Sequence, residues 1–214
     1  MSKPLLIFGV GPMVELAHYY FTQHAGRQVE AFTVDAAFLS ASCFAGLPVL
    51  PFDEAQRRFP PSTHELFVAV GYSDFNRPRK RIFLQAQALG YTLPSFVHES
   101  AVVASNVVIG ANCQVRELAV VQAFARVGDN VSIGTRAAVS HHARIDSHVW
   151  LGNNSNVNGG AVIEECCFLG TNANVRDKVT VGAGCIVGAG ALIMSDCPPG
   201  GVYAATPTSR RIRA

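Results

Sequence analysis

Residues 127–151 read VGDNVSIGTRAAVSHHARIDSHVWL, in which an aliphatic side chain returns at every sixth position, at Val127, Ile133, Val139, Ile145 and Leu151. The same period continues through seventeen hexads, from Val97 to Ile193, without an inserted residue. A short fixed period predicts a solenoid, and a hexapeptide period predicts a parallel β-helix. Residues three hexads apart are then expected to stack directly above one another.

The first 96 residues follow a different pattern, in which apolar strands alternate with helices. The predicted elements are a strand at 4–8, a helix at 13–24, a strand at 29–34, a short extended segment at 48–50, a helical segment at 53–59, a strand at 66–70 and a helix at 77–89. This β-α-β order predicts a small parallel, Rossmann-like sheet with helices on its faces. We therefore expect an α/β domain over residues 1–96 and a hexapeptide-repeat domain over residues 97–214.

Composition narrows the class of protein. Hydrophobic residues make up 49% of the chain and charged residues 15%, which predicts a substantial core rather than disorder. A net charge of +2 and the lack of a basic run argue against nucleic-acid binding. No apolar run is long enough to cross a membrane, and the N-terminus does not resemble a cleavable signal. The cytoplasm is the expected location.

The cysteines do not predict disulfides or a zinc site. Four of the six, Cys113, Cys167, Cys185 and Cys197, fall on the small inward position of the hexad, four residues after the aliphatic one. A free cysteine behaves there as a compact core residue. No pair of CxxC motifs with the spacing of a zinc site occurs.

A glycine-containing turn follows the first predicted strand. The sequence Gly9-Val10-Gly11-Pro12-Met13-Val14 is a partial dinucleotide fingerprint, because Val14 stands where a third glycine is expected. It fits either a tight strand-to-helix turn or a helix N-terminus that receives the phosphates of a ligand. Asp35, at the end of the second strand, is a candidate acceptor for a ribose hydroxyl or a base imide. A nucleotide is therefore a candidate ligand of this domain.

The pair His141-His142 is the strongest candidate for catalysis. His141 takes an outward hexad position, and the residue three hexads later is Gly159, which leaves open space beside the imidazole. Histidine titrates near neutral pH and is a common general base. The competing interpretation is an ordinary surface histidine.

Two other features of the solenoid have structural or metal-binding interpretations. His142 and His148 share a hexad position on successive faces and point in different directions within one chain, so a metal site would need a neighbouring subunit. No metal is expected. The asparagine-rich segment 153–160 predicts left-handed corners of the solenoid, because asparagine tolerates that conformation, although it also borders the coil above His141.

The whole chain resembles the bacterial sugar acyltransferases of the left-handed β-helix class, above all the nucleotide-sugar acetyltransferases and the sialic acid O-acetyltransferase-like proteins. The hexads carry most of this resemblance. The shorter segments that contribute are Gly9–Gly11, Asp35, Val70-Gly71-Tyr72 with Asn76 and Arg79, Ser140-His141-His142, residues 167–170, residues 187–191 and the tail Tyr203-Ala204-Ala205-Thr206-Pro207. The left-handed coiling is implied by the family, not by the periodicity.

The resemblance implies a homotrimer that binds acetyl-CoA in the groove between adjacent solenoids. It implies that His141 removes a proton from an amine or hydroxyl of the sugar, with His142 as its catalytic neighbour. The residues implied for acetyl-CoA are Gly159, Thr171 and Ala189. The residues implied for the sugar nucleotide are Gly9, Gly11, Asp35 and Gly71.

The chain departs from the family pattern in two places. An acidic residue usually follows the catalytic histidine, where it orients the imidazole, and His142 stands at that position here. The tail motif is also altered, to Ala205-Thr206-Pro207-Thr208.

From the sequence we expect an acetyl-CoA-dependent acyltransferase acting on a sugar in surface-glycan biosynthesis, with a nucleotide-linked sugar as the expected acceptor. Two alternatives stay open: a metal-dependent lyase or hydratase on the same solenoid, and a non-catalytic trimeric scaffold. The sequence does not identify the sugar, the nucleotide, the acyl chain or the acceptor atom.

Overall fold

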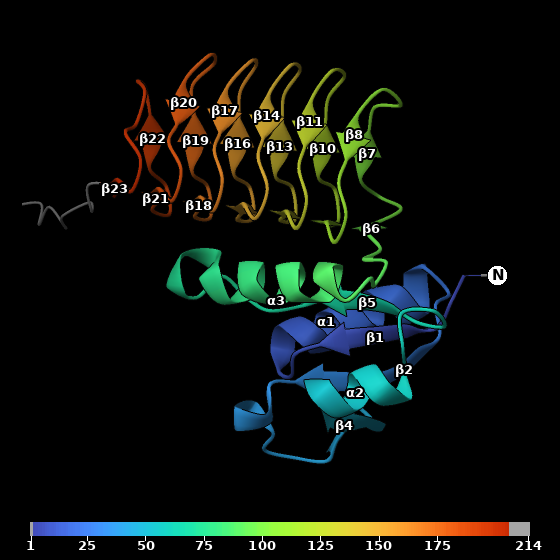
Figure 1. Cartoon of the computed structure of the whole chain (residues 1–214). Coiled ribbons are helices and arrows are strands. Elements are labelled where there is room, and N and C mark those ends of the chain that lie inside the picture. The colour runs from blue at the N-terminus through green and yellow to red at the C-terminus, as the bar shows by residue number, and fades with distance from the viewer. Residues whose placement is uncertain (1, 206–214) are drawn as a thin grey trace, which may run out of the picture.

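The structure is a computed structural model and describes residues 2–205. A small α/β domain lies beneath a solenoid of stacked coils, and the chain passes from one to the other at β6 (Phe96–Val97) (Figure 1). Both architectures are those that the sequence predicts, and the solenoid is a left-handed parallel β-helix. The altered residues Thr206, Pro207 and Thr208 of the tail lie outside the described residues.

The α/β domain is built on a sheet with the strand order β3-β4-β2-β1-β5. Its strands are β1 (Leu5–Phe8), β2 (Val29–Val34), β3 (Cys43–Phe44), β4 (Leu47–Pro51) and β5 (Glu65–Val68). All pair in parallel except β3, which forms a hairpin with β4. The hairpin turns through Ala45 and Gly46, both at positive φ, a turn that matches the twist of its strands. The sequence does not predict β3, because two residues carry no periodicity.

Helices cover both faces of this sheet. They are α1 (Pro12–Tyr19), α2 (Phe52–Arg58) and α3 (Arg77–Ala88), with short turns η1 (Tyr20–His24), η2 (Ala36–Phe38) and η3 (Asp74–Asn76). The predicted helix at 13–24 is α1 continued by the π-helical turn η1. Alternate side chains of β1 enter different cores: Leu5 and Ile7 pack with α1, and Leu6 and Phe8 pack with α2 and α3.

The β-helix has three faces of stacked two-residue strands. Face 1 consists of β6 (Phe96–Val97), β9 (Gln114–Val115), β12 (Ser132–Ile133), β15 (Trp150–Leu151), β18 (Phe168–Leu169), β21 (Ile186–Val187) and β23 (Val202–Tyr203). Face 2 consists of β7 (Val102–Val103), β10 (Val120–Val121), β13 (Ala138–Val139), β16 (Asn156–Val157), β19 (Asn174–Val175) and β22 (Leu192–Ile193). Face 3 consists of β8 (Val108–Ile109), β11 (Arg126–Val127), β14 (Arg144–Ile145), β17 (Val162–Ile163) and β20 (Thr180–Val181). We call the turns between the faces edge 1–2, edge 2–3 and edge 3–1.

The interior of the solenoid matches the hexad pattern. The aliphatic side chains of the middle coils, such as Ile133 and Ile163, are fully buried, and so are the small side chains that alternate with them. Cys113, Cys167, Cys185 and Cys197 lie in this core as free thiols. Val97 differs, because it belongs to the open first coil and is exposed.

The edges depend on left-handed backbone at one hexad position. Asn130, His142 and Asn154 all have φ between 55° and 60° there. The asparagine-rich segment is structural in the way the sequence predicts: Asn154 forms such a corner, and Asn156 Nδ2 donates to Asn174 Oδ1 on the next coil at 2.9 Å. Amide ladders of this kind tie successive coils together.

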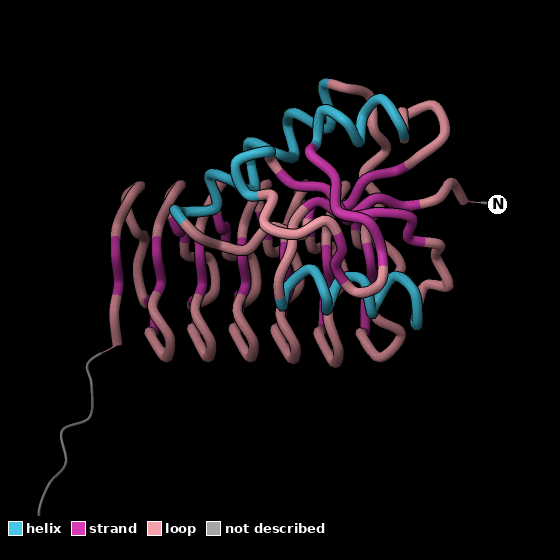
Figure 2. The backbone as a smooth tube through the Cα atoms, turned by 90° about the horizontal axis from the view of Figure 1, so that it is seen from below, coloured by secondary structure: helices cyan, strands magenta, loops and turns pink. Residues whose placement is uncertain are grey.

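The α/β domain rests on face 1 of the solenoid. Face 1 is the part of the coils nearest to α3, which runs along the solenoid, while β7, β8 and their counterparts lie on the far side (Figure 1). Tyr20 donates to Glu117 on edge 1–2, and Lys80 pairs with Glu165 on edge 3–1 at 2.8 Å. Figure 2 shows the domain covering the earlier coils, with the last coils extending beyond it. Edge 2–3 is therefore the edge opposite the α/β domain.

Candidate active site

His141 lies on edge 2–3, in the turn that follows β13. Its backbone N–H donates to Gln122 Oε1 at 3.0 Å, and its carbonyl accepts from Gly160 N–H at 3.0 Å. The next residue, His142, takes the left-handed corner with φ of 60°. Contacts to the coils below and above thus fix the backbone, while both imidazoles remain exposed.

The imidazole of His141 lies against Gly159, one coil above. A β-carbon at Gly159 would come within 2.7 Å of His141 Cε1 and 3.0 Å of Nε2, closer than van der Waals contact allows. Gly159 has no left-handed φ, so the requirement for glycine comes from space alone. The open space that the sequence predicts beside His141 is filled by its own ring.

His142 is the partner of His141. The two Nδ1 atoms are 3.2 Å apart, and the rings meet edge to face at 82°. His142 in turn stacks on Phe124, with ring centroids 4.8 Å apart and planes inclined by 28°. Within residues 2–205, no ion pair joins a carboxylate to either histidine.

One tautomer of the pair suits a general base. If His141 Nδ1–H donates to His142 Nδ1, then His141 Nε2 carries a free lone pair. His142 must then be neutral, with its own proton on Nε2. The two rings together therefore present a single oriented proton acceptor at Nε2 of His141.

Thr171 and Ala189 lie on a different edge from His141. They stack in one column on edge 1–2, where Gly190 N–H donates to the carbonyl of Thr171 at 2.9 Å, and both are exposed. Face 2 separates them from edge 2–3. The structure therefore brings His141, His142 and Gly159 together, and places Thr171 and Ala189 across one face of the solenoid.

A cleft opens at the carboxyl ends of β1, β2 and β5 in the α/β domain. Its volume is about 400 Å³. β2 and β4 lie on one side of β1 and β5 on the other, so the cleft lies where the strand order reverses, a common place for ligands in such sheets. The lining residues are Phe8, Gly9, Val10, Pro12, Met13, Val14, Val34, Asp35, Phe38, Ala69, Val70, Gly71, Ser73, Pro78, Arg81 and Ile82.

Three of the four predicted substrate residues, Gly9, Asp35 and Gly71, line this cleft. Gly11 lies beside it as the N-cap of α1, with φ of 102° and nothing within 4 Å of a β-carbon placed there. Gly9 is held tightly, because a β-carbon would meet Val14 Cγ2 at 2.7 Å.

Sequence reasoning missed Arg81, which reaches the cleft from α3 and forms an ion pair with Asp35. The signal was present as a basic residue on the amphipathic helix after the third strand. A single sequence does not indicate, however, which of the four basic residues of α3 faces the cleft.

Two properties of residues 2–205 bear on other classes of function. No group of three or more His, Cys, Asp or Glu side chains in this part of the chain is placed to hold a metal ion. Within the same residues, no helix combines the length and apolar character needed to span a bilayer.

Comparison with known proteins addresses the family and the fold of the chain. Residues 160–194 match the family described as bacterial transferase hexapeptide (six repeats). A search of curated proteins gives no match. A histidine-to-asparagine variant of perosamine N-acetyltransferase from Caulobacter crescentus, solved with CoA and GDP-perosamine, is 29% identical, with a TM-score of 0.86 over 98% of this chain and 97% of that one.

A second solved structure, the acetyltransferase domain of PglB from Neisseria gonorrhoeae, is 31% identical, with a TM-score of 0.86 over 96% of this chain and 98% of that one. WeeI from Acinetobacter baumannii shares the fold at 20% identity, with a TM-score of 0.83 over 96% and 98% of the two chains. Each of these similarities spans both the α/β domain and the β-helix.

Proposed function

Since the chain belongs to the hexapeptide-repeat sugar acetyltransferases, we propose that it transfers the acetyl group of acetyl-CoA to an amino group of a nucleotide-linked amino sugar. The observation that carries the proposal is the imidazole of His141, fixed against Gly159 with Nδ1 beside His142. The choice of an amine over a hydroxyl is supported by the similarity to perosamine N-acetyltransferase, which was solved with CoA and GDP-perosamine.

His141 is the general base in this proposal. The sugar nitrogen attacks the thioester carbonyl, its proton passes to His141 Nε2, and the carbon–sulfur bond breaks to release the CoA thiolate. The protonated imidazole can then return the proton to sulfur, which leaves the acetamide and free CoA. General-base catalysis of this kind contributes typically about 10²–10⁴-fold.

His142 is a positioning residue, at the position where the family pattern implied by the sequence resemblance has an acid. An imidazole Nδ1 accepts one hydrogen bond, so it can hold the tautomer of His141. It lacks the negative charge with which a carboxylate stabilises the imidazolium that forms. Stacking on Phe124 fixes the ring of His142 and so limits the rotation of the pair.

Acetyl-CoA is proposed to lie in a groove between two subunits. Gly159 adjoins the histidine pair on edge 2–3, whereas Thr171 and Ala189 form a column on edge 1–2. One extended ligand contacts all of them most directly if edge 2–3 of one solenoid lies beside edge 1–2 of a neighbour. Such a contact joins two different edges of the solenoid, and around a threefold axis it forms a closed ring of three subunits.

A trimer is also supported by apolar side chains on the part of the solenoid that the α/β domain leaves uncovered. These exposed residues are Val102, Val108, Leu118, Phe124, Leu192 and Met194. Burying such side chains against a second copy is the main source of association free energy.

The sugar nucleotide is proposed to bind in the cleft of the α/β domain. The Gly9–Gly11 turn leaves backbone space for phosphates at the start of α1, and Asp35 provides an acceptor for a ribose or base N–H or O–H group. Within one chain, however, this cleft and His141 lie on opposite sides of the solenoid. The sugar must therefore reach the His141 of another subunit.

A transfer assay tests the activity. Purified protein with acetyl-CoA and a panel of GDP-, UDP- and TDP-linked amino sugars should release free CoA thiol and yield an acetylated sugar. The His141→Ala variant should be slower by about 10²–10⁴-fold with unchanged fold. A metal-dependent lyase or a scaffold releases no CoA thiol with any acceptor, and a fully active His141→Ala variant would remove His141 from the mechanism.

A mixing experiment tests the shared site. Asp35→Ala should lack sugar-nucleotide affinity, and His141→Ala should lack the base. If each site combines the cleft of one subunit with the histidine of another, co-refolded mixtures of the two variants should recover part of the activity. Mixtures that stay as inactive as the separate variants would show that each site is built from one chain.

A further inference from the structure

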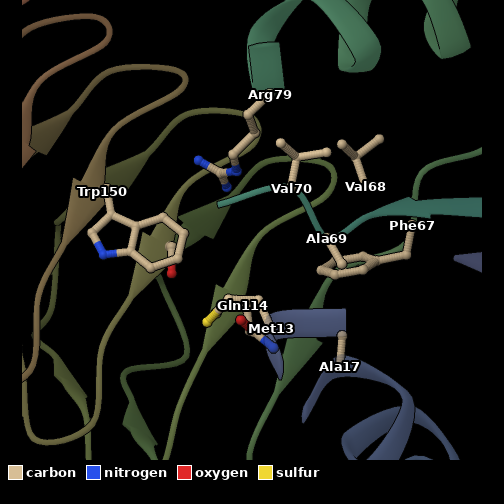
Figure 3. A pocket seen from close by; sticks show the side chains of 10 residues that line it. Met13, Ala17, Phe67, Val68, Ala69, Val70, Arg79, Gln114 and Trp150 are labelled. Atoms are coloured by element: carbon tan, nitrogen blue, oxygen red, sulfur yellow. The ribbon is translucent and has the colours of Figure 1, made fainter. Parts of the chain in front are cut away.

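A small cavity lined by both apolar and polar side chains lies between the α/β domain and face 1 of the solenoid, behind the proposed nucleotide cleft. Met13, Ala69 and Val70 separate the two, because they line both. Figure 3 shows Arg79 reaching from α3 toward Trp150 and Gln114, with Val70 and Ala69 on the other side. The polar side chains of the cavity come from both domains: Arg79 from α3, Gln114 from β9 and Ser132 from β12.

Hydrogen-bond donors converge on this cavity. Arg79 Nη1, Gln114 Nε2 and Ser132 Oγ are buried, and none of them has a hydrogen-bond partner among the described residues. The three residues are 3%, 6% and 1% exposed. Buried polar groups are nearly always paired in folded proteins, so a cluster of donors that share one cavity points to a common acceptor.

The charge around the cavity is positive, and no carboxylate among the described residues pairs with it. No ion pair of residues 2–205 includes Arg79, and no acidic side chain lines the cavity. Burial lowers the pKa of Arg79 to about 10, so the guanidinium keeps its charge at neutral pH. It lies 5.6 Å from the ring centroid of Trp150, and the buried Arg116 lies 5.5 Å from the same ring. An isolated buried cation is unfavourable unless an anion or dipoles compensate for it.

The size of the cavity limits the class of ligand. Its volume of about 10 Å³ is close to the space that one water-sized particle takes up. A phosphate group of the sugar nucleotide does not fit this volume, and Met13 and Val70 stand between it and the cleft. A chloride ion is somewhat larger than a water molecule, so it fits here only when the lining side chains move slightly apart.

We propose that Arg79, Gln114 and Ser132 bind a single small inorganic anion of the halide class, such as chloride, that joins the α/β domain to the β-helix. Arg79 Nη1 and Gln114 Nε2 can only donate, and the Ser132 hydroxyl can donate as well, so an anion that accepts from all three beside a positive charge matches the site better than a water molecule, which accepts about two hydrogen bonds. The bound anion neutralises Arg79 at the interface that orients the nucleotide cleft on the solenoid. The proposal does not depend on the acetyl-transfer reaction.

A bromide experiment on the wild-type protein tests the site directly. Crystals grown or soaked in bromide should show anomalous scattering between Arg79, Gln114 and Ser132. An ordered site without anomalous signal, at a bromide concentration that labels surface sites, would identify a water and overturn the proposal.

Thermal unfolding provides an independent test in solution. At equal ionic strength, replacing a large organic anion such as gluconate by chloride should raise Tm by about 3–6 °C when chloride is at ten times its dissociation constant. Ser132→Ala removes one donor from a buried strand without changing the backbone, and should weaken the chloride dependence. Arg79→Met should abolish it.

The matched control is Lys80→Met, because Lys80 is the next residue of α3 and its ammonium pairs with Glu165 outside the cavity. This variant should keep the full chloride dependence. An equal chloride effect in wild-type protein, Arg79→Met and Ser132→Ala would show that chloride acts elsewhere. If Arg79→Met does not fold, the chloride dependence of Ser132→Ala and the bromide signal in the wild-type protein still test the proposed anion site.

Discussion

The side chain of Asn112 hydrogen-bonds both backbone groups of Val68. Asn112 Oδ1 accepts from Val68 N–H at 2.7 Å, and Asn112 Nδ2 donates to the Val68 carbonyl at 3.1 Å. Val68 ends β5, the edge strand of the α/β sheet, so an amide on edge 3–1 of the solenoid takes the place of a neighbouring strand. Asn112 Nδ2 also donates to Asn130 Oδ1 at 2.9 Å, which extends the contact to the next coil.

The first prediction concerns this contact. Asn112→Gly keeps the left-handed corner, where φ is 54°, but leaves Val68 N–H and C=O without partners in a buried interface. We expect a loss of about 2–4 kcal/mol in the free energy of unfolding, measured with urea. Asn172→Gly is the control, because Asn172 holds the same hexad position with φ of 59° but is exposed. Equal losses in both variants would contradict a role of the Asn112 side chain in joining the domains.

Much of this arrangement can be read from the sequence, because its cause is local and repetitive. The hexads determine which side chains of each coil face inward, and a spacing of three hexads places Gly159 above His141 from the residue numbers alone. The contact between Asn112 and Val68 has no such signal. It depends on how two independently patterned domains dock, and neither the β-α-β order nor the hexad period contains that information.

The same limit explains what the sequence predicts about the site. Gly9, Asp35 and Gly71 follow strands of one parallel sheet, so their convergence follows from topology. The sequence leaves the partner of His141 open, because the orientation of two adjacent imidazoles depends on Gly159 and Phe124 in three dimensions. The separation of Thr171 and Ala189 from His141 has a signal in the residue numbers, because spacings of 30 and 48 residues are not multiples of three hexads and therefore fall on another edge.

The second prediction concerns pH and the buried His148. Its Nδ1 accepts from Asn130 Nδ2 at 2.8 Å, and Nε2 is 3.8 Å from Glu165 Oε1. Burial lowers the pKa of His148 to about 4, an effect that Glu165 opposes and that Lys80 and Arg79 reinforce. Between pH 6.5 and about 4, the unfolded chain therefore binds a proton here that the folded chain does not. The free energy of unfolding should therefore decrease as the pH is lowered from 6.5 to about 4, by at most about 3 kcal/mol.

His148→Asn provides the comparison for this effect. Asparagine tolerates the φ of 64° at this corner, and its Oδ1 can accept from Asn130, so the amide ladder is preserved. We measure the free energy of unfolding of both proteins from pH 4 to pH 8. The difference between the two values should vary with pH only through the titration of His148. Parallel stability curves over the whole range would show that His148 titrates alike in the folded and unfolded chains.

The third prediction concerns the space beside the imidazole of His141, the proposed general base. Gly159→Ala introduces a β-carbon 2.7 Å from His141 Cε1, and the exposed imidazole must rotate away. Because His141 can move without disturbing the core, unfolding should be nearly unchanged while turnover falls by about 10²-fold. Ser105→Ala, at the same hexad position two coils below His141, should change neither quantity. A fully active Gly159→Ala enzyme would mean that His141 works in another rotamer.

The last prediction separates the two possible roles of His142. If it orients His141 through the contact between their Nδ1 atoms at 3.2 Å, then His142→Ala should lower kcat by about 10–10²-fold with a small change in KM, because the tautomer and the ring angle are no longer fixed. His142→Glu should keep much of the activity, since a carboxylate accepts the same hydrogen bond and adds a negative charge that stabilises the imidazolium. Phe124→Ala is the control for the ring stack, which it removes while leaving the hydrogen bond in place. Phe124→Ala should therefore cost less turnover than His142→Ala. The contrary outcome is that His142→Glu, His142→Ala and Phe124→Ala are all equally slow. His142 would then act by packing on Phe124, and Gly159 and the substrate would orient His141.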